Sequence, residues 1–286
     1  MSQNRFTIYT DSSSDILPPE LLELKLERVK LYCNFINDNS PVNIDDLDDF
    51  YARVCPSNMA KTAAANPNDF IEAFEPALQA GDDVLYFGIP AALSGTFNSS
   101  QVAREELLGR YPGRDIICLD SGCICGGLRF LAQEVARRRD LGSDINDLAA
   151  FIQGVTIGHE FTSDNLDYFH AGGRISRAVE VAGRILNIQP VLHLNEADEL
   201  TQRLKVRGTR RAVEELAKAA AEKIVERNHR VLISYAPGAK EKAELLATML
   251  RSMIGDVVIE FSLIGPVIGA HCGPNTLALF YQATRR

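Results

Sequence analysis

The sequence predicts an α/β protein whose N-terminal domain holds a parallel sheet of βαβ units and whose smaller C-terminal domain is α+β. The first observation is a repeated strand–loop–helix pattern. Asp83–Ile89 and Asp115–Asp120 are largely apolar runs, and each is followed by a loop of small residues and a helical stretch. Continuous apolar strands that alternate with helices are typical of a parallel sheet.

The second observation is a change of pattern after Gly142. Two helical stretches come first, and then Pro190–Leu194 and Leu204–Arg207 have the pattern of two strands joined by an acidic turn. A hairpin that is followed by helices indicates a separate domain with a partly antiparallel sheet. The expected domains are therefore residues 1–155 and 156–286.

The remaining elements are predicted by periodicity and by proline. Pro18-Pro19 opens a helix, a position that favours proline, and the alternating apolar residues from Val29 to Phe35 indicate one half-buried strand. The other N-terminal elements expected are strand Arg5–Thr10, polar loop Asp11–Asp15, acidic helix Ile44–Val54, loop Cys55–Asn66, helix Pro67–Gly81 and helices that end at Leu108 and Arg139. The last C-terminal elements expected are helix Arg211–Arg227, strand Val231–Tyr235, helix Ala239–Met253, strand Val257–Ile264 and strand Thr276–Ala283.

Composition and charge argue against several functional classes. The 286 residues are 46% hydrophobic and 24% charged, which is ordinary for a globular protein. The formal net charge of −8, with no basic stripe, argues against a nucleic-acid-binding role. No apolar run reaches the length of a membrane-spanning helix, and the N-terminus lacks the apolar region of a signal peptide, so a cytoplasmic location is expected.

The six cysteines predict neither a disulfide framework nor a metal site. They are scattered, and most lie in apolar segments, as expected of small buried side chains in a reducing compartment. Cys123 and Cys125 flank a single residue, which is too close for the usual zinc-binding pair, and no second cluster follows. No metal and no cofactor is therefore expected.

Three loops are expected to meet at one rim of the parallel sheet. Asp11–Asp15, Ala91–Thr96 and Asp120–Gly127 each follow the carboxyl end of a predicted strand. Ligands of parallel α/β sheets gather at such loops. The rim is therefore the expected place for a binding site.

Ser94-Gly95-Thr96 is the strongest candidate for an anion site on this rim. Free N–H groups and a positive dipole end face a ligand at a helix start, Ser94 and Thr96 add hydroxyl donors, and Gly95 permits close approach. The same serine is also explained as a simple helix cap, and the motif alone does not decide between the two roles. It is not a P-loop, because no Gly-Lys-Ser/Thr is present.

His271 lies in a glycine-rich segment that is expected to be a turn. It is either a structural histidine bonded to a carbonyl group or a side chain that projects into a site and binds an anion. Arg174 and Arg207 are explained in isolation as surface ion-pair residues. Thr62 lies in a predicted loop, and no periodicity there gives it a role.

Taken in order, these segments resemble the DegV family of fatty-acid-binding proteins, the lipid-carrying partners of bacterial fatty acid kinase. Seven motifs carry the resemblance in sequence with fitting spacing. They are Tyr9–Asp15, Thr62, Leu93–Phe97, Asp120-Ser121, Gly172-Gly173-Arg174-Ile175-Ser176, Lys205–Arg207 and Ile264–His271.

The resemblance implies a single long-chain fatty acid bound between the two domains. It implies that Thr62, Ser94 and His271 hydrogen-bond the carboxyl group and that Gly95 and Thr96 supply close backbone approach and a further donor. A separate kinase subunit would then phosphorylate the presented carboxylate. Arg174 and Arg207 become candidates for contacting the head group, the phosphate or the kinase.

Two departures from the family pattern concern the head-group region. The family's Thr-Ser-Gln-Pro loop is Thr62-Ala63-Ala64-Ala65 here, so one hydroxyl and a stiffening proline are missing. The usual Thr-Gly-Pro-Gly after the histidine is Cys272-Gly273-Pro274-Asn275, in which asparagine suggests a left-handed backbone position. These changes affect expectations about chain-length preference and head-group geometry more than the fold.

A competing hypothesis is a serine-dependent hydrolase or acyltransferase. Ser94 as nucleophile and His271 as base would supply two thirds of a catalytic triad. No Gly-x-Ser-x-Gly elbow is present, because Ala92-Leu93 precedes the serine. The non-catalytic carrier is the reading that the sequence favours.

Overall fold

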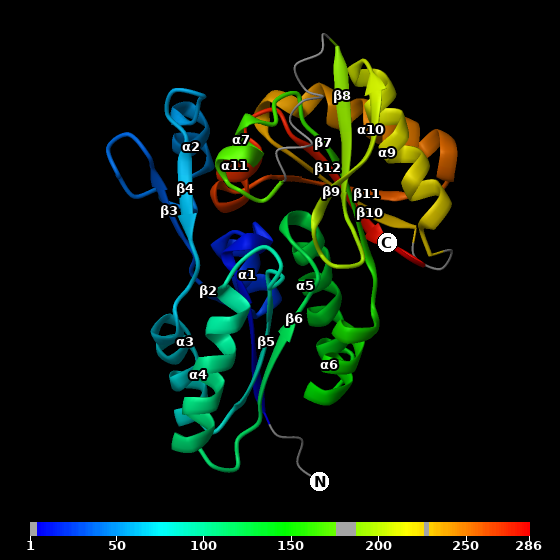
Figure 1. Ribbon diagram of the computed structural model, residues 1–286. Helices are drawn as coiled ribbons and strands as arrows, with labels where there is room; N and C mark the ends of the chain where they lie inside the picture. Colours follow the sequence, from blue (N-terminus) through cyan, green and yellow to red (C-terminus); the bar gives the residue numbers. More distant parts are fainter. Residues whose placement is uncertain (1–4, 176–186, 226–228) are drawn as a thin grey trace.

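A computed structural model describes residues 5–175, 187–225 and 229–286. Two β-sheets form the two halves of the molecule, with a four-stranded sheet in the lower half of Figure 1 and a six-stranded sheet in the upper half. A separate two-stranded ribbon lies to one side. The mixed α/β fold class predicted from the sequence is confirmed.

The four-stranded sheet is entirely parallel, in the order β2-β1-β5-β6. Its central strand β5 is buried at every residue, which explains why it carries no alternation of polar and apolar side chains. The predicted parallel sheet is confirmed. Its strands are β1 (Phe6–Asp11), β2 (Glu27–Val29), β5 (Asp83–Gly88) and β6 (Ile116–Asp120).

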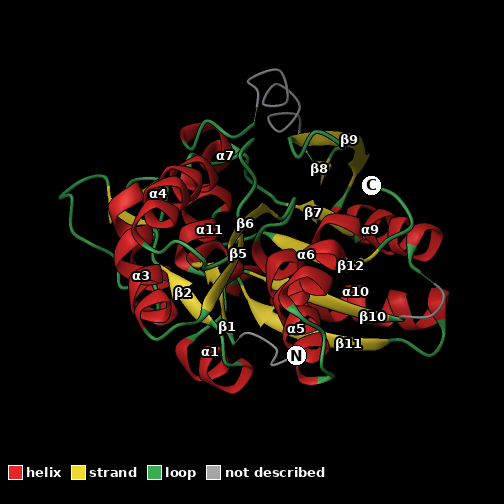
Figure 2. Ribbon diagram, turned by 90° about the horizontal axis from the view of Figure 1, so that it is seen from below, coloured by secondary structure: helices red, strands yellow, loops and turns green. Residues whose placement is uncertain are grey.

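Helices cover both faces of this sheet (Figures 1 and 2). On one face, Phe70 and Phe74 of α3 pack against Tyr9 and Tyr86 of the sheet. α5 and α6 lie on the other face, and the loop after β1 forms the short helix η1 (Ser12–Ser14). The helices are α1 (Pro18–Leu24), α3 (Pro67–Gln79), α4 (Thr96–Arg110), α5 (Cys125–Asp140) and α6 (Ile145–Gly154).

The six-stranded sheet has the order β11-β10-β12-β7-β8-β9, and only β10 and β11 pair in parallel. The predicted hairpin is confirmed as β8–β9, and the partly antiparallel sheet with it. One face is covered by α9 and α10, and α5 packs against the other. The elements are β7 (Ile157–Thr162), β8 (Ile188–Leu194), β9 (Leu200–Arg207), α9 (Thr209–Lys223), β10 (Arg230–Tyr235), η2 (Pro237–Ala239), α10 (Lys240–Ile254), β11 (Val258–Leu263) and β12 (Leu277–Gln282).

The start of α5 fits between the two sheets because it begins with glycines. A Cβ atom on Gly126 would lie 2.2 Å from Ser234 Oγ, and one on Gly127 would lie 2.2 Å from His159 Nε2. The His159 ring is held in place, since Ile124 N–H donates to its Nε2 at 3.2 Å. All strands of the parallel sheet precede residue 155 and all strands of the second sheet follow it, but α5 packs on both, so the domain boundary itself stays a prediction.

The single strand predicted from Val29 to Phe35 is wrong. β2 ends at Val29, and β3 (Tyr32–Phe35) pairs instead with β4 (Ala60–Ala63) in the separate ribbon. The break occurs where the hydroxyl of Ser12 accepts the Leu31 N–H, a bond that alternation of residue types cannot reveal. The predicted loop Cys55–Asn66 is also wrong, because it contains strand β4, which pairs with β3.

The acidic helix is shorter than predicted. α2 (Leu47–Arg53) begins three residues later than Ile44, because the Asp46 side chain accepts the Asp49 N–H at 3.0 Å and caps the helix there. Its acidic first turn is present, in Asp48 and Asp49.

Two elements escaped the sequence-based prediction. The second helical stretch expected after Gly142 is mostly β7, which is buried throughout and so lacks a strand period, and only α7 (Asp167–Ala171) is helical. The glycine-rich segment around His271 is a helix, α11 (Pro266–Cys272), with proline in its first turn. The left-handed residue after it is Gly273, with φ of 76°, and not Asn275.

Replacing Gly127 by alanine is expected to lower the free energy of unfolding by about 1–3 kcal/mol, because the new methyl group overlaps the fixed His159 ring. Urea unfolding measures the change. Gly109→Ala is the matched control, since it also lies inside a helix but has no atom within 4 Å of the added Cβ. It should stabilise the protein by about 0.5–1 kcal/mol. Equal effects of the two substitutions would contradict the tight fit of α5.

Candidate functional site

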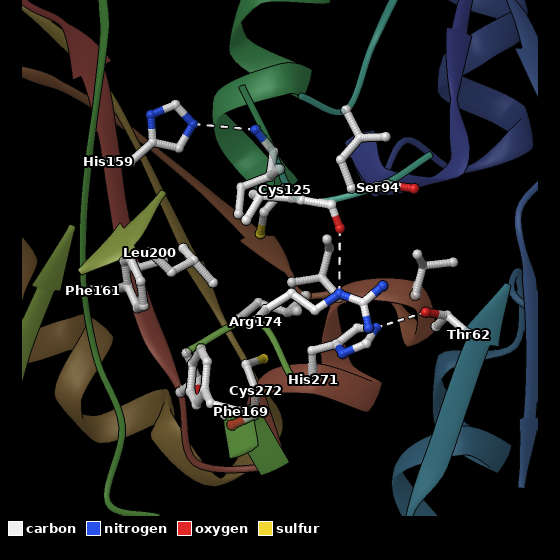
Figure 3. Close-up of a pocket in the computed structure, with 18 of the residues that line it drawn as sticks. Thr62, Ser94, Cys125, His159, Phe161, Phe169, Arg174, Leu200, His271 and Cys272 are labelled. Carbon is white, nitrogen blue, oxygen red and sulfur yellow. Dashed lines mark hydrogen bonds between the residues drawn. The ribbon is translucent and has the colours of Figure 1, made fainter. Parts of the chain in front are cut away.

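A cavity lies between the two halves of the molecule and is lined mostly by apolar side chains (Figure 3). The empty space between its atoms, including the open mouth, is about 840 Å³. The wall is formed by the loop after β5, the start of α5, strand β4 of the ribbon, strands of the six-stranded sheet and α11. Apolar residues of the wall include Leu31, Ile89, Leu93, Phe161, Val267 and Phe280.

Thr62 and His271 meet at this cavity although they are 209 residues apart in the chain. Thr62 Oγ1, on β4, lies 2.6 Å from His271 Nε2, on α11. The other ring nitrogen, Nδ1, is buried and has no hydrogen-bond partner among the described residues. A Cβ on Gly172, the residue after α7, would lie 2.2 Å from Nδ1, so the backbone at Gly172 packs directly against the imidazole ring.

The imidazole of His271 is held in its neutral form. Burial is the main reason that its pKa falls to about 4, and the nearby positive charge of Arg174 lowers it further. A neutral ring has one N–H donor and one acceptor nitrogen. If Nε2 carries the proton and donates to Thr62, the hydroxyl proton of Thr62 is free to point into the cavity.

Ser94 lines the cavity and precedes Gly95, which is the N-cap residue of helix α4. Its Oγ lies 2.9 Å from Thr96 Oγ1 and accepts the Thr96 N–H at 3.3 Å. Ser94 is therefore not the N-cap residue that the sequence offered as the alternative, although its hydroxyl accepts the first N–H of the helix. Thr96 is fully buried and Gly95 is exposed, and neither is part of the cavity wall.

The rim predicted from the ends of the strands is confirmed. The Asp11 carboxylate, after β1, accepts hydrogen bonds from the Ile89 N–H and the Tyr86 hydroxyl of the β5 segment. Asp120, at the end of β6, accepts the Ala91 N–H at 2.8 Å. These bonds join the three loops directly.

The two candidate arginines have different surroundings. Arg174 lines the cavity, and its Nε donates to the backbone carbonyl of Leu93 at 3.3 Å. Arg207 is exposed at the end of β9 and does not line the cavity. Ser176, the last residue of the Gly-Gly-Arg motif, lies outside the described residues.

No sequence pattern indicated that His159 belongs to the cavity wall. Its Nδ1 lies 2.9 Å from the carbonyl oxygen of Ile157, and burial, together with the charge of Arg286, lowers its pKa to about 3. His159 lies on β7, and its position at the cavity was missed because that strand was not predicted. In Figure 3 it lies on the opposite side of the cavity from Thr62 and Ser94.

The arrangement lacks the hydrogen bond that a serine–histidine nucleophile needs. Ser94 Oγ bonds Thr96, whereas His271 Nε2 bonds Thr62. Within the part of the chain that the structure describes, no three His, Cys, Asp or Glu side chains are grouped so that they could hold a metal ion. None of the described helices has both the length and the apolar character needed to cross a membrane.

Residues 5–284 match the family model described as "Uncharacterised protein, DegV family". The chain belongs to the DegV family. A DegV domain-containing protein of Clostridium perfringens is 34% identical over 284 residues, which are 97% of each chain. The resemblance inferred from the seven motifs is thereby confirmed.

Solved structures share the whole fold. A DegV family protein from Thermus thermophilus, described as binding fatty acid, is 25% identical with a TM-score of 0.82, covering 98% of this chain and 99% of that one. The fatty acid kinase B3 protein of Streptococcus pneumoniae, loaded with linoleic acid, is 21% identical with a TM-score of 0.81 and covers 98% and 99%.

The depressed pKa of His271 predicts acid sensitivity of the ligand-free protein. Between about pH 6.5 and about pH 4 the unfolded chain binds a proton at this residue and the folded chain does not, so the free energy of unfolding falls as the pH falls through this window. The loss is on the order of 3 kcal/mol. Urea unfolding at pH 7 and pH 4.5 should therefore show a smaller difference for His271→Gln than for the natural protein. Identical differences would contradict a buried neutral imidazole.

Proposed function

We propose that the protein binds one long-chain fatty acid in this cavity, with the carboxylate at Thr62, Ser94 and His271. The observation that supports it best is that these polar side chains lie at one side of a cavity whose wall is mostly apolar (Figure 3). Such a cavity suits a molecule with one polar end and a long hydrocarbon body. The fatty acids bound by structural relatives support the same ligand class.

In this proposal the hydroxyls act as the direct donors to the carboxylate. His271 donates from Nε2 to Thr62, which orients the Thr62 hydroxyl proton toward the ligand. Thr96 and Gly95 act through Ser94, by the bond to its hydroxyl and by the helix start that they form. Ser94 then donates to the second carboxylate oxygen.

Arg174 supplies positive charge beside the head group. Because it lines the cavity, a bound carboxylate would be attracted to it, and since Arg174 is itself exposed, water and salt screen part of this attraction. Arg207 is exposed and is therefore proposed to face a partner and not the lipid.

We further propose that the chain is a non-catalytic subunit that presents the carboxylate to a partner kinase in the cytoplasm. The likeness to the Streptococcus pneumoniae protein, which is named as part of a fatty acid kinase, supports this role. The kinase would transfer phosphate to the presented carboxylate and form an acyl phosphate.

Ala63 and Ala64 line the cavity next to Thr62, so the altered loop leaves this part of the wall apolar.

The direct test is to denature the purified protein and analyse its organic extract by mass spectrometry. One equivalent of a long-chain fatty acid is expected, or uptake of added oleate or palmitate by delipidated protein. Absence of both co-purified lipid and uptake would count decisively against the proposal.

Ser94→Ala and His271→Ala should each weaken oleate binding by about 1.5–3 kcal/mol, since each removes a hydrogen bond on which the charged head group depends. Isothermal titration calorimetry with delipidated protein measures the change. Ser99→Ala is the control, because Ser99 lies on the same helix but does not line the cavity. Unchanged affinity of both site variants would show that the head group binds elsewhere.

A serine-reactive fluorophosphonate distinguishes the carrier from a hydrolase. Ser94 is expected to remain unlabelled, because its hydroxyl is bonded to Thr96 and has no histidine partner. Stoichiometric labelling at Ser94, detected by peptide mass spectrometry, would overturn the non-catalytic assignment.

A further inference from the structure

Ser94 lies at the end of a tight turn that connects strand β5 to helix α4. After β5 ends at Gly88, the backbone carbonyl of Pro90 accepts the N–H groups of both Leu93 and Ser94, at 3.0 and 3.1 Å. These two hydrogen bonds connect Ser94 directly to the start of the turn Pro90–Ser94. Whatever fixes its first residues also fixes the hydroxyl of Ser94.

The neighbouring strand β6 holds this turn through the side chain of Asp120. One carboxylate oxygen accepts the Ala91 N–H at 2.8 Å, and the other accepts the N–H of Gly122 at 3.0 Å. The next residue, Ser121, donates its hydroxyl to the carbonyl of Gly88 at 2.6 Å. Asp120 is thus anchored in its own loop and bonded to the turn Pro90–Ser94 in the loop beside it.

We infer that Asp120 is a positioning residue for the head-group site, which acts on the ligand only through the turn that carries Ser94. This inference rests on the proposed fatty-acid function. It gives Asp120 a role beyond capping its own loop.

The direction in which Asp120→Ala changes the fatty-acid affinity distinguishes a positioning role from an electrostatic one. The Asp120 carboxylate and the carboxylate of a bound fatty acid are both negative, so loss of the Asp120 charge alone would strengthen binding. Release of the turn does the opposite, because the ligand must then order Ser94 when it binds. Weaker binding by Asp120→Ala therefore reports on the turn.

Asp120 is a better target for this test than Asp11, which holds the same segment through Ile89 N–H. Asp11 is fully buried and accepts four hydrogen bonds, two of them from Ser13. Removal of the Asp11 carboxylate would destabilise the parallel sheet. Asp120 is only partly buried, and its replacement leaves the core intact.

The experiment is a double-mutant cycle on the full chain, with oleate affinity measured by calorimetry on delipidated protein. Asp120→Ala should weaken binding about fivefold or more, whereas Asp120→Ala combined with Ser94→Ala should bind within about twofold of Ser94→Ala alone. Asp144→Ala is the matched control. Asp144 caps α6 by accepting two backbone N–H groups, so its loss should lower stability but leave oleate affinity unchanged.

A second measurement does not depend on the ligand. Hydrogen exchange at the Ala91 amide should become faster in Asp120→Ala, because its acceptor is gone. Unchanged or tighter binding by Asp120→Ala, unchanged exchange at Ala91, or additive losses in the double variant would each overturn the positioning role. If the natural protein binds neither oleate nor palmitate, the proposed function fails and the inference fails with it. Normal binding by the natural protein combined with any of the first three results overturns the inference alone.

Discussion

The contact between α5 and the six-stranded sheet is the constraint on which the remaining architecture depends. Gly126 and Gly127 let the helix approach Ser234 and His159 closely, and no other residue type fits there without displacement. The first turn of α5 thereby joins the two halves of the molecule, and Cys125 in that turn lines the cavity. Because the wall combines loops of the N-terminal half with strands of the six-stranded sheet, the site exists only when the two halves are assembled.

Much of the fold followed from local pattern. The strands β5 and β6 and the helices after them were predicted because an apolar run, a loop of small residues and a helical stretch follow one another twice. β7 was missed because a strand buried on both faces, with His159 and Glu160 inside it, shows neither alternation nor an apolar run. α11 was missed because glycines, which usually mark turns, are used there for close packing, as at Gly269 against Phe50.

The site was only partly predictable from the residues themselves. The rim and Ser94 followed from the rule that parallel strands end at one edge. Thr62 and His271 could not be placed this way, since a pair 209 residues apart has no local signal. The family resemblance brought them together, and the structure shows that they do bond each other. Asp120 was predicted only to lie in a rim loop, because its bond to Ala91 joins two loops that are distant in the sequence.

A wall shared by both halves of the molecule also has a thermodynamic consequence. A fatty acid in the cavity would contact β4 and α11 at once, and it would bind the assembled form but not separated halves. The lipid would then stabilise the native state by mass action, in proportion to the logarithm of its free concentration. Lipid-starved cells would hold a larger fraction of partly opened chains, which proteases remove first. The amount of protein in the cell would thus follow the supply of its cargo.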